Sequence, residues 1–310
     1  MMKIAVIGAG AMGSIYGGHL SLRNEVWMVD TNLEIIRRIQ EVGLVLEEGD
    51  SRSTYHPQAV KDTAGLGQVD LVILFVKALF SRAALSENRG LIGPDTYVMT
   101  LQNGSGHEDV LSEFVELDHI IIGTTEDQGT VLGPAEIRHG GEGKTNIGML
   151  VPDTAGILGK LRDNFDACGF CVKVHDNIQQ LIWDKLFTNI SLSAVTAVLQ
   201  VRMGYIAGNT HAWEMTRMLL HEAVETAHAL GLSADETALL DKVRKTSENV
   251  PDGVTSICAD LGNGRRTEVD TISGSVVRAA AACGVSVPCH EFLVHMVHAL
   301  EEKRDSSLAF

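Results

Sequence analysis

Hydrophobic and polar positions change their spacing near residue 175, and this change divides the chain into two halves. Before that point, short runs rich in Val, Ile and Leu alternate with amphipathic stretches of helical period. After it, strand-like runs stop and long helical periodicity takes over. Alternating strands and helices are typical of a parallel sheet covered by helices. We therefore predict an α/β domain over residues 1–175, followed by an all-α domain over residues 176–310.

The same pattern predicts the order of the elements. We expect strands at 3–7, 25–29, 70–77, 96–101, 119–125 and 171–174, a helix at 31–43 and an antiparallel excursion within 43–57. Two further runs, 135–139 and 145–149, flank a Gly-rich turn and predict a hairpin that closes the sheet. In the second half we expect helices at 177–199, 210–230, 233–248, 265–284 and 289–303.

A glycine motif follows the first predicted strand. It has the form Gly-x-Gly-x-x-Gly and consists of Gly8, Ala9, Gly10, Ala11, Met12 and Gly13. The first glycine permits a tight turn, the second lets a pyrophosphate approach the backbone, and the third lets the helix pack close to the sheet. The helix N-terminus then offers free N–H groups to the phosphates. Because a strand precedes the motif and a helical pattern follows it, we predict a Rossmann-like dinucleotide-binding domain and assign these six residues to the cofactor.

The second predicted strand, residues 25–29, ends at an acidic residue. Asp30 lies about 20 residues past the glycines, where a carboxylate can accept a hydrogen bond from the ribose 2′-OH of NAD. A carboxylate repels a 2′-phosphate, and the next residue is Thr31 rather than an arginine. We therefore predict NAD or NADP as the cofactor, with NADH favoured. Arg37 and Arg38 lie far enough along the next helix to reach a phosphate, which leaves NADPH as the alternative.

Composition and charge exclude several classes of function. Hydrophobic residues make up 45% of the chain, so a sizeable core is expected. The formal net charge is −15, which argues against binding to nucleic acids or anionic membranes, because both need a basic face. No apolar run approaches the roughly 20 residues of a membrane span. The N-terminus leads straight into a core strand instead of a secretory leader, so we expect a cytoplasmic protein.

The five cysteines form an odd number spread over a long chain, which favours reduced thiols over a disulfide framework. Cys168 and Cys171 have the C-x-x-C spacing, but no second pair accompanies them. We predict that both are buried structural thiols. His290, His295 and His298 also cluster in the sequence, but no acidic ligand completes a set there, and we predict no metal site.

Polar residues stand at places where an α/β enzyme would need them. Lys77 ends a buried strand and Asn103 follows the next one, and ligands in such sheets bind beyond the carboxyl ends of the strands. In the helix predicted at 177–199, Lys185, Asn189 and Ser193 recur at intervals of four and so share one face. An ammonium group on that face can protonate the oxygen that hydride addition to a carbonyl creates.

These motifs, taken in order, resemble the ketopantoate reductase (2-dehydropantoate 2-reductase) family. The resemblance rests on the glycine motif, Lys77, residues 102–104, the Trp-x-Lys-x-x-x-Asn segment over 183–189 and the Arg-Thr-Glu-Val-Asp segment over 266–270. It runs over nearly the whole chain. It implies that Lys185 is the proton donor and that Lys185, Asn189 and Ser256 bind the substrate. Ser193, which shares the helix face of Lys185, is the fourth residue that we assign to the substrate. The resemblance also implies that the cofactor is contacted by Lys77, Asn103, Gly129 and Glu268.

Some positions depart from the family pattern. Many members have a second asparagine where this chain has Ser193, and a later asparagine that approaches the substrate aligns near Met203. The resemblance therefore implies NAD(P)H-dependent reduction of a 2-oxo acid, by default ketopantoate to pantoate. Two alternatives stay open: an NAD-dependent D-2-hydroxy acid dehydrogenase for another branched or aromatic 2-oxo acid, and a dinucleotide-binding sensor without turnover. The partner expected is a small 2-oxo acid, and the apolar helical half would allow a homodimer.

Overall fold

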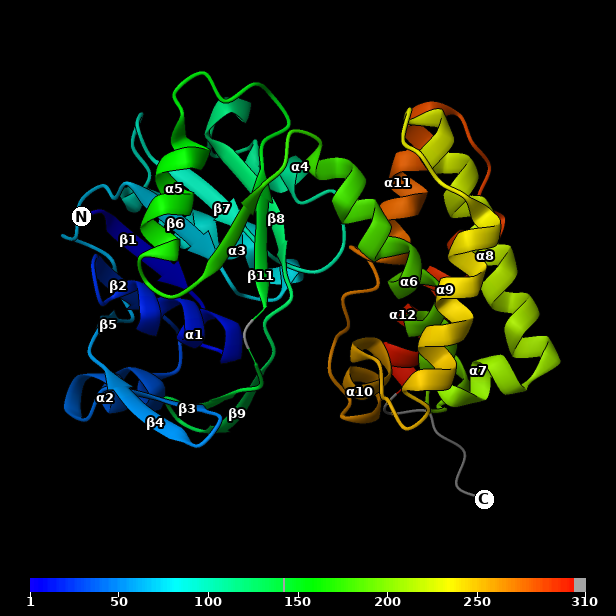
Figure 1. Cartoon of the computed structure of the whole chain (residues 1–310), viewed down its shortest axis with the longest axis horizontal. Helices are drawn as coiled ribbons and strands as arrows, with labels where there is room; N and C mark the ends of the chain where they lie inside the picture. Colours follow the sequence, from blue (N-terminus) through cyan, green and yellow to red (C-terminus); the bar gives the residue numbers. More distant parts are fainter. Residues whose placement is uncertain (142, 304–310) are drawn as a thin grey trace. The chain divides into compact units, whose positions relative to one another are not determined.

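The structure, a computed structural model, describes residues 1–141 and 143–303. It divides into two compact units, which we call the N-terminal unit and the helical unit (Figure 1). The N-terminal unit consists of residues 1–102 and 107–178. The helical unit takes the chain from residue 179 onward together with the short segment 103–106. No helix in the described part of the chain combines the length and hydropathy needed to cross a membrane.

The N-terminal unit is built on an eight-stranded sheet. In spatial order its strands are β12 (Cys171–Val174), β11 (Lys144–Gly148), β8 (Ile120–Thr125), β7 (Tyr97–Thr100), β6 (Leu71–Leu74), β1 (Lys3–Ile7), β2 (Glu25–Val29) and β5 (Gln58–Val60). All neighbouring pairs are parallel except β8 and β11. Strand β6 is buried along its whole length and β1 at every residue after Lys3, as expected of a sheet covered on both faces. This arrangement confirms the Rossmann-like α/β prediction.

The strand order of this sheet reverses beside β1. From β1 the chain passes through α1 (Ala11–Leu20) to β2 on one side, whereas β6 lies on the other side of β1. Where the strand order reverses, the loops that follow two neighbouring strands run to opposite sides of the sheet. A crevice opens between these loops at the carboxyl ends of the strands. The glycine motif after β1 and the segment after β6 therefore meet at the place where such sheets bind ligands.

A second, four-stranded sheet lies against α1. Its order is β4 (Ser51–Tyr55), β3 (Leu44–Glu48), β10 (Glu136–His139) and β9 (Gly129–Gly133). Helix α1 contacts β1 and β2 of the large sheet and all four strands of the small one (Figure 1). The β3–β4 pair is antiparallel, as predicted for residues 43–57. The remaining helices of this unit are α2 (Leu33–Glu41), α3 (Ser81–Glu87), α4 (Glu108–Leu111) and α5 (Ile157–Asp166).

The predicted hairpin of residues 135–139 and 145–149 was wrong. Strand β10 pairs with β9 and, in parallel, with β3, whereas β11 pairs with β8 and β12 in the large sheet. The burial patterns explain the difference. Arg138 in the middle of β10 is exposed, which suits a sheet with one solvated face, while residues 145–148 of β11 are all buried and fit inside the large sheet.

The helical unit has its own core. Its helices are α6 (Ile178–Leu199), α7 (Gly204–Gly208), α8 (Thr210–Ala229), α9 (Glu236–Asn249), α10 (Ser256–Gly262), α11 (Ser273–Cys283) and α12 (Pro288–Glu302). The all-α prediction is therefore confirmed, although α7 and α10 were not expected. Aromatic and aliphatic side chains of α6, including Trp183 and Phe187, pack into this core.

Two local predictions need correction. The helix expected at 265–284 begins only at Ser273, because the buried Thr267 donates from both its backbone N–H and its hydroxyl to the Glu301 carboxylate, which holds the preceding segment outside a helix. Cys168 is a buried free thiol as predicted, but Cys171 is exposed. Cys171 begins β12, the edge strand of the large sheet, so one side of it faces solvent.

Candidate functional site

The glycine motif forms a tight turn that only glycine permits at two of its positions. Gly8 has φ = +101°, and a Cβ there would lie 2.8 Å from the backbone of Phe75 just after β6. A Cβ on Gly13 would lie 1.8 Å from the carbonyl oxygen of Gly8. Gly10 is different, because a Cβ there would meet no atom within 4 Å. The protein thus leaves open space beside Gly10, at the start of α1, where a phosphate needs to approach.

The N-terminus of α1 leaves its first N–H groups available. Gly10 is the N-cap residue and has no side chain to accept a hydrogen bond from them. Ala11, Met12 and Gly13 therefore begin the helix without a side-chain cap from that position. An anion placed there would be bound by backbone N–H groups and by the positive end of the helix dipole.

A pocket of about 270 Å³ opens beside this turn. Its lining combines apolar walls with a few polar groups: Ile7, Gly8, Val29, Asp30, Thr31, Lys61, Val76, Phe80, Ala83, Ala84, Glu87 and Asn88. Mostly apolar walls with a few polar groups are typical of small-molecule sites. The pocket lies at the carboxyl ends of β1, β2 and β6, so the residues present fit a dinucleotide at the reversal of strand order.

Asp30 does more than line this pocket. Its Oδ2 accepts a hydrogen bond from the backbone N–H of Ala9 at 2.7 Å, and its Oδ1 accepts one from the N–H of Asn32 at 2.8 Å. The carboxylate therefore fixes the glycine turn from the neighbouring strand. The sequence placed Asp30 beside the cofactor but did not show that it also holds Ala9 in place.

The structure places the other residues predicted to contact the cofactor in both units. Lys77 is half-buried and precedes a short 3₁₀ turn (Ala78–Phe80) after β6. Gly129 begins β9, and a Cβ there would lie 2.9 Å from side-chain carbons of both Ala11 and Ile15 on α1. In the N-terminal unit, Gly129 is thus brought close to the first turn of α1, which supports its assignment to the same site as the glycine motif.

Asn103 and Glu268 belong to segments that meet in the helical unit. Asn103 is exposed, and the adjacent Gly104 packs so tightly that a Cβ there would lie 2.1 Å from the carbonyl oxygen of Thr271. Ser105 donates its N–H to that same oxygen at 2.9 Å. Thr271 in turn donates its N–H to the carbonyl of Glu268 at 3.1 Å. Two residues that the sequence assigned separately to the cofactor thus lie on one connected loop system.

The polar stripe of α6 is present as predicted. Lys185 and Asn189 are half-buried, and Ser193 is buried, on a helix most of whose other residues pack into the core. The Thr188 hydroxyl oxygen, three positions after Lys185, is a buried atom without a hydrogen-bond partner among the described residues. Sequence analysis missed Thr188, since a threonine in a helix carries no signal of its own.

Hydrogen bonds connect the stripe to Ser256. The Thr255 hydroxyl donates to the carbonyl of Ser193 at 3.3 Å and lies 2.8 Å from the Thr196 hydroxyl on α6. Thr255 is also the N-cap residue of α10, where its oxygen accepts from the N–H of Cys258. Ser256, which follows it, is exposed. The structure therefore brings the segment of Ser256 to the stripe, and Thr255, which the sequence did not single out, fixes its position.

Comparison with known families agrees with this geometry. Residues 4–152 match the family described as ketopantoate reductase PanE/ApbA, and residues 177–301 match the C-terminal region of the same family. Together these two segments cover most of the chain. The 2-dehydropantoate 2-reductases of Streptococcus pyogenes and Halobacterium salinarum are each 29% identical to this chain, over 97% and 96% of it and 98% of each relative.

Solved structures with the same fold include enzymes of two descriptions. A ternary complex of D-mandelate dehydrogenase with NADH and anilino(oxo)acetate superposes with a TM-score of 0.87 at 31% identity, over 97% of this chain and 99% of that one. A PanE/ApbA family ketopantoate reductase from Ralstonia eutropha JMP134 also has a TM-score of 0.87, at 29% identity over 98% and 100% of the two chains. The chain therefore belongs to the ketopantoate reductase family of oxidoreductases that act on CH–OH groups.

Proposed function

We propose that this protein reduces a 2-oxo acid to a 2-hydroxy acid with NAD(P)H, and that ketopantoate is its default substrate. The observation that carries the proposal is the stripe of Lys185, Asn189 and Ser193 on a helix that is otherwise largely buried. Polar side chains gathered on one face of a largely apolar helix can bind and orient a ligand. A 2-oxo acid presents a carbonyl and a carboxylate, and both accept hydrogen bonds from ammonium, amide and hydroxyl groups.

The N-terminal unit would hold the cofactor. Residues 8–13 would bind its pyrophosphate through backbone N–H groups, and the pocket beside Asp30 would take its adenosine end. Lys77, Asn103, Gly129 and Glu268 would contact the rest of the cofactor, as the family resemblance implies. When bound, the reduced nicotinamide supplies a hydride to the substrate carbonyl carbon.

Lys185 would supply the proton. Its ammonium group can hydrogen-bond to the carbonyl oxygen and stabilise the negative charge that develops there, then transfer a proton to it. Asn189, Ser193 and Ser256 would hold the substrate so that its carbonyl oxygen faces Lys185. The hydrogen bond from the Thr255 hydroxyl to the Ser193 carbonyl would keep these groups in a fixed arrangement before the substrate binds.

We further propose that NADH is preferred to NADPH. Asp30 lines the pocket with a carboxylate that is already fixed by two backbone N–H groups, so it cannot easily turn away from a 2′-phosphate. The D-mandelate dehydrogenase to which this chain is similar was crystallised with NADH. Both observations favour the unphosphorylated cofactor.

A second candidate is an NAD-dependent D-2-hydroxy acid dehydrogenase for a bulkier 2-oxo acid. The 31% identity to D-mandelate dehydrogenase over nearly the whole chain favours it. The family resemblance implies an asparagine where this chain has Ser193 and a later one, near Met203, that approaches the substrate. The pocket would thus offer fewer amides to a hydroxyl-bearing substrate. An aromatic or branched 2-oxo acid would need fewer such partners.

The deciding experiment is a steady-state comparison of NADH and NADPH with ketopantoate, phenylglyoxylate and branched 2-oxo acids. Turnover with ketopantoate at the highest kcat/KM supports the default, and turnover mainly with a bulkier acid supports the second candidate. Tight dinucleotide binding without turnover on any 2-oxo acid would contradict both and favour a non-catalytic sensor. A homodimer and a cytoplasmic location stay predictions from the sequence, and light scattering of the purified protein would check the former.

A further inference from the structure

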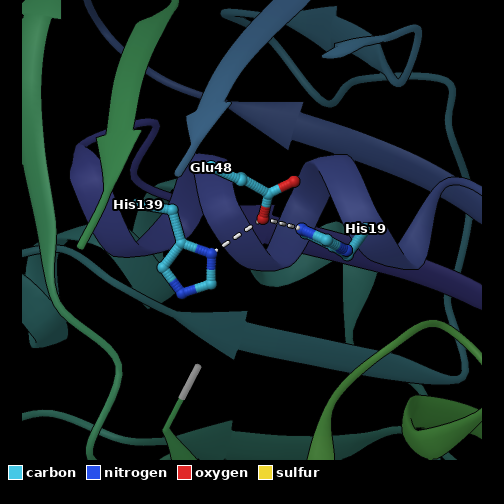
Figure 2. Close-up of side chains that lie close together, drawn as sticks. All are labelled: His19, Glu48 and His139. Carbon is cyan, nitrogen blue, oxygen red and sulfur yellow. Dashed lines mark hydrogen bonds and ion pairs between the residues drawn. The ribbon is translucent and has the colours of Figure 1, made fainter. Parts of the chain in front are cut away.

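Two histidines converge on one carboxylate in the N-terminal unit, away from the glycine turn. His19 comes from α1, Glu48 from the end of β3 and His139 from the end of β10 (Figure 2). The Nε2 of His19 and the Nδ1 of His139 lie 2.9 Å and 2.8 Å from the same oxygen, Oε1 of Glu48. Glu48 and His139 are register partners in the β3–β10 pair, which places their side chains on one face of the small sheet.

The outer nitrogen of each imidazole has an acceptor of its own. His19 Nδ1 lies 3.2 Å from the carbonyl oxygen of Cys168, and His139 Nε2 lies 3.1 Å from Oδ1 of Asp127. A carbonyl and a carboxylate only accept hydrogen bonds, so these outer nitrogens carry the ring protons. In the neutral tautomers, the two inner nitrogens therefore turn lone pairs toward the Glu48 carboxylate. Three electron-rich atoms then face one another, and either a second ring proton or a bound metal ion can occupy the space between them.

The outer acceptors match the surroundings of metal-binding histidines. Such histidines almost always donate their second N–H to a carboxylate or a backbone carbonyl, which fixes the tautomer and the ring orientation. Asp127 is itself fixed, because the N–H of Gly143 donates to its Oδ1 at 2.9 Å and the Thr125 hydroxyl donates to its Oδ2 at 2.9 Å. The ring of His139 is thus held in position by a buried carboxylate before any ion arrives.

We propose that His19, Glu48 and His139 bind one divalent ion of the zinc class, with water completing the coordination. Two imidazoles and one carboxylate are a ligand set that Zn²⁺ accepts. The three ligand atoms lie within 4.8 Å of one another. Tetrahedral bonds of about 2.0–2.1 Å would separate ligand atoms by roughly 3.3 Å. Each imidazole nitrogen, now 2.8–2.9 Å from Glu48 Oε1, would therefore move away from it by about 0.5 Å, and the two nitrogens would approach each other by at most about 1.5 Å. The ion would cross-link α1 to the small sheet.

Protons are the competing occupant of this cluster. The hydrogen bond to Asp127 raises the pKa of His139 to about 9, so a second proton on its ring can also face Glu48. A proton-bridged cluster and a metal-binding cluster should respond differently to added Zn²⁺. A cluster held by protons alone gains nothing from Zn²⁺, whereas a metal site binds one ion per chain and resists thermal unfolding better when it is loaded.

The test uses the full-length chain without an affinity tag, after treatment with a chelator. Zn²⁺ is titrated by calorimetry, and the unfolding temperature is measured with and without the ion. We expect one Zn²⁺ per chain with a Kd in the micromolar range or below, and a higher unfolding temperature. His19→Gln and Glu48→Gln should each weaken binding by at least about 100-fold, and Asp127→Asn, which acts through His139, by about 10- to 100-fold.

His221 and Glu236 provide a matched control. His221 is exposed and Glu236 half-buried in the helical unit, with His221 Nδ1 3.0 Å from Glu236 Oε2, and the two belong to no group of three potential ligands within residues 1–141 and 143–303. His221→Gln should leave the stoichiometry and the Kd unchanged. The proposal is overturned if the folded wild-type chain binds no Zn²⁺ at micromolar concentration, or if His19→Gln and Glu48→Gln, shown to be folded by circular dichroism, bind it as tightly as the wild type.

Discussion

The Asp30 carboxylate holds the backbone N–H of Ala9 at 2.7 Å and so ties the end of β2 to the turn after β1. Ala9 is buried, so its N–H loses its protein acceptor if this carboxylate is removed. One side chain thereby carries two separable properties: it satisfies a backbone donor of the glycine turn, and it puts a negative charge in the proposed adenosine pocket. Substitutions can separate the two.

Asp30→Asn should change cofactor preference with little loss of stability. The asparagine oxygen can still accept from Ala9, but the charge that repels a 2′-phosphate is gone. We expect the ratio of kcat/KM for NADH over NADPH to fall about tenfold or more, which corresponds to the roughly 1.5–3 kcal/mol of a hydrogen bond to a charged group.

Asp30→Ala is the matched variant. It leaves the buried N–H of Ala9 unsatisfied, so the free energy of unfolding should drop by about 1–3 kcal/mol. Chemical denaturation of both variants checks this. An unchanged cofactor ratio in Asp30→Asn would argue that the carboxylate serves the turn alone.

Gly10→Ala and Gly13→Ala should impair different properties, namely dinucleotide affinity in the first variant and stability in the second. A methyl group on Gly10 meets no protein atom within 4 Å, so the variant should fold with wild-type stability and lose dinucleotide affinity. A methyl group on Gly13 would lie 1.8 Å from the Gly8 carbonyl oxygen and must displace α1, so that variant should lose stability first. Thermal unfolding and NADH titration of each variant separate the outcomes. Wild-type NADH affinity in Gly10→Ala would place the pyrophosphate elsewhere.

Lys185→Ala should lower kcat by about 10²- to 10⁴-fold while NADH still binds, because general acid catalysis contributes on that scale. Alanine is a strong helix former, so α6 should persist. Lys242→Ala is the control: the Lys242 ammonium contacts the same helix, donating to the Asp184 carbonyl at 3.2 Å, but lies outside the stripe. Near-wild-type kcat in Lys185→Ala would exclude Lys185 as the proton donor.

Thr255→Val and Ser256→Ala should distinguish a residue that positions the substrate site from one that contacts the substrate. Thr255→Val removes the N-cap oxygen of α10 and the bond to the Ser193 carbonyl, so stability should fall by about 1 kcal/mol and KM for the 2-oxo acid should rise. Ser256 is exposed, so Ser256→Ala should raise KM without a stability change. Denaturation curves and substrate KM values for both variants check this. Equal KM values in Ser256→Ala and the wild type would remove Ser256 from the substrate site.

Local patterns sufficed for much of the fold. The run at 70–77 predicted β6 because a strand buried on both faces needs apolar residues throughout, and the glycine motif predicted the turn because only glycine fits at Gly8 and Gly13. The stripe of Lys185, Asn189 and Ser193 was also readable, since residues four apart on a helix share a face. Each of these signals lies within a short stretch of sequence.

The rest depends on contacts between distant segments. One of the two partners of β10 is β3. This pairing places His139 beside Glu48 across 91 positions, and no local spacing indicates it. The cluster that these two residues form with His19 could not be predicted from the sequence for the same reason. The sequence prediction of no metal site considered only histidines that are close together along the chain. Thr255 likewise acquires its role through a contact with α6, 62 positions away.

His290 predicts a loss of stability in mild acid. It is fully buried on α12, its Nε2 donates to the Leu219 carbonyl at 2.9 Å, and its Nδ1 has no partner among the described residues. Burial lowers its pKa below the ordinary value of about 6.5, and this outweighs the opposing effects of the Leu219 carbonyl and the Glu222 carboxylate. The folded state therefore binds fewer protons than the unfolded state at pH values just below 6.5.

The contribution of neutral His290 to the free energy of unfolding is therefore fully present above about pH 6.5 and is lost as the pH falls below that value. The free energy of unfolding should decrease by up to about 1.4 kcal/mol for each pH unit. His290→Gln keeps a donor for Leu219 but cannot titrate, so it should flatten the acid side of the stability curve. His221→Gln is the control, because Glu236 raises the pKa of His221 and its contribution is lost at higher pH instead. Denaturation between pH 5 and 8 measures both. An acid slope that His290→Gln leaves unchanged would assign the loss to carboxylates, since their protonation is the other source of instability in acid.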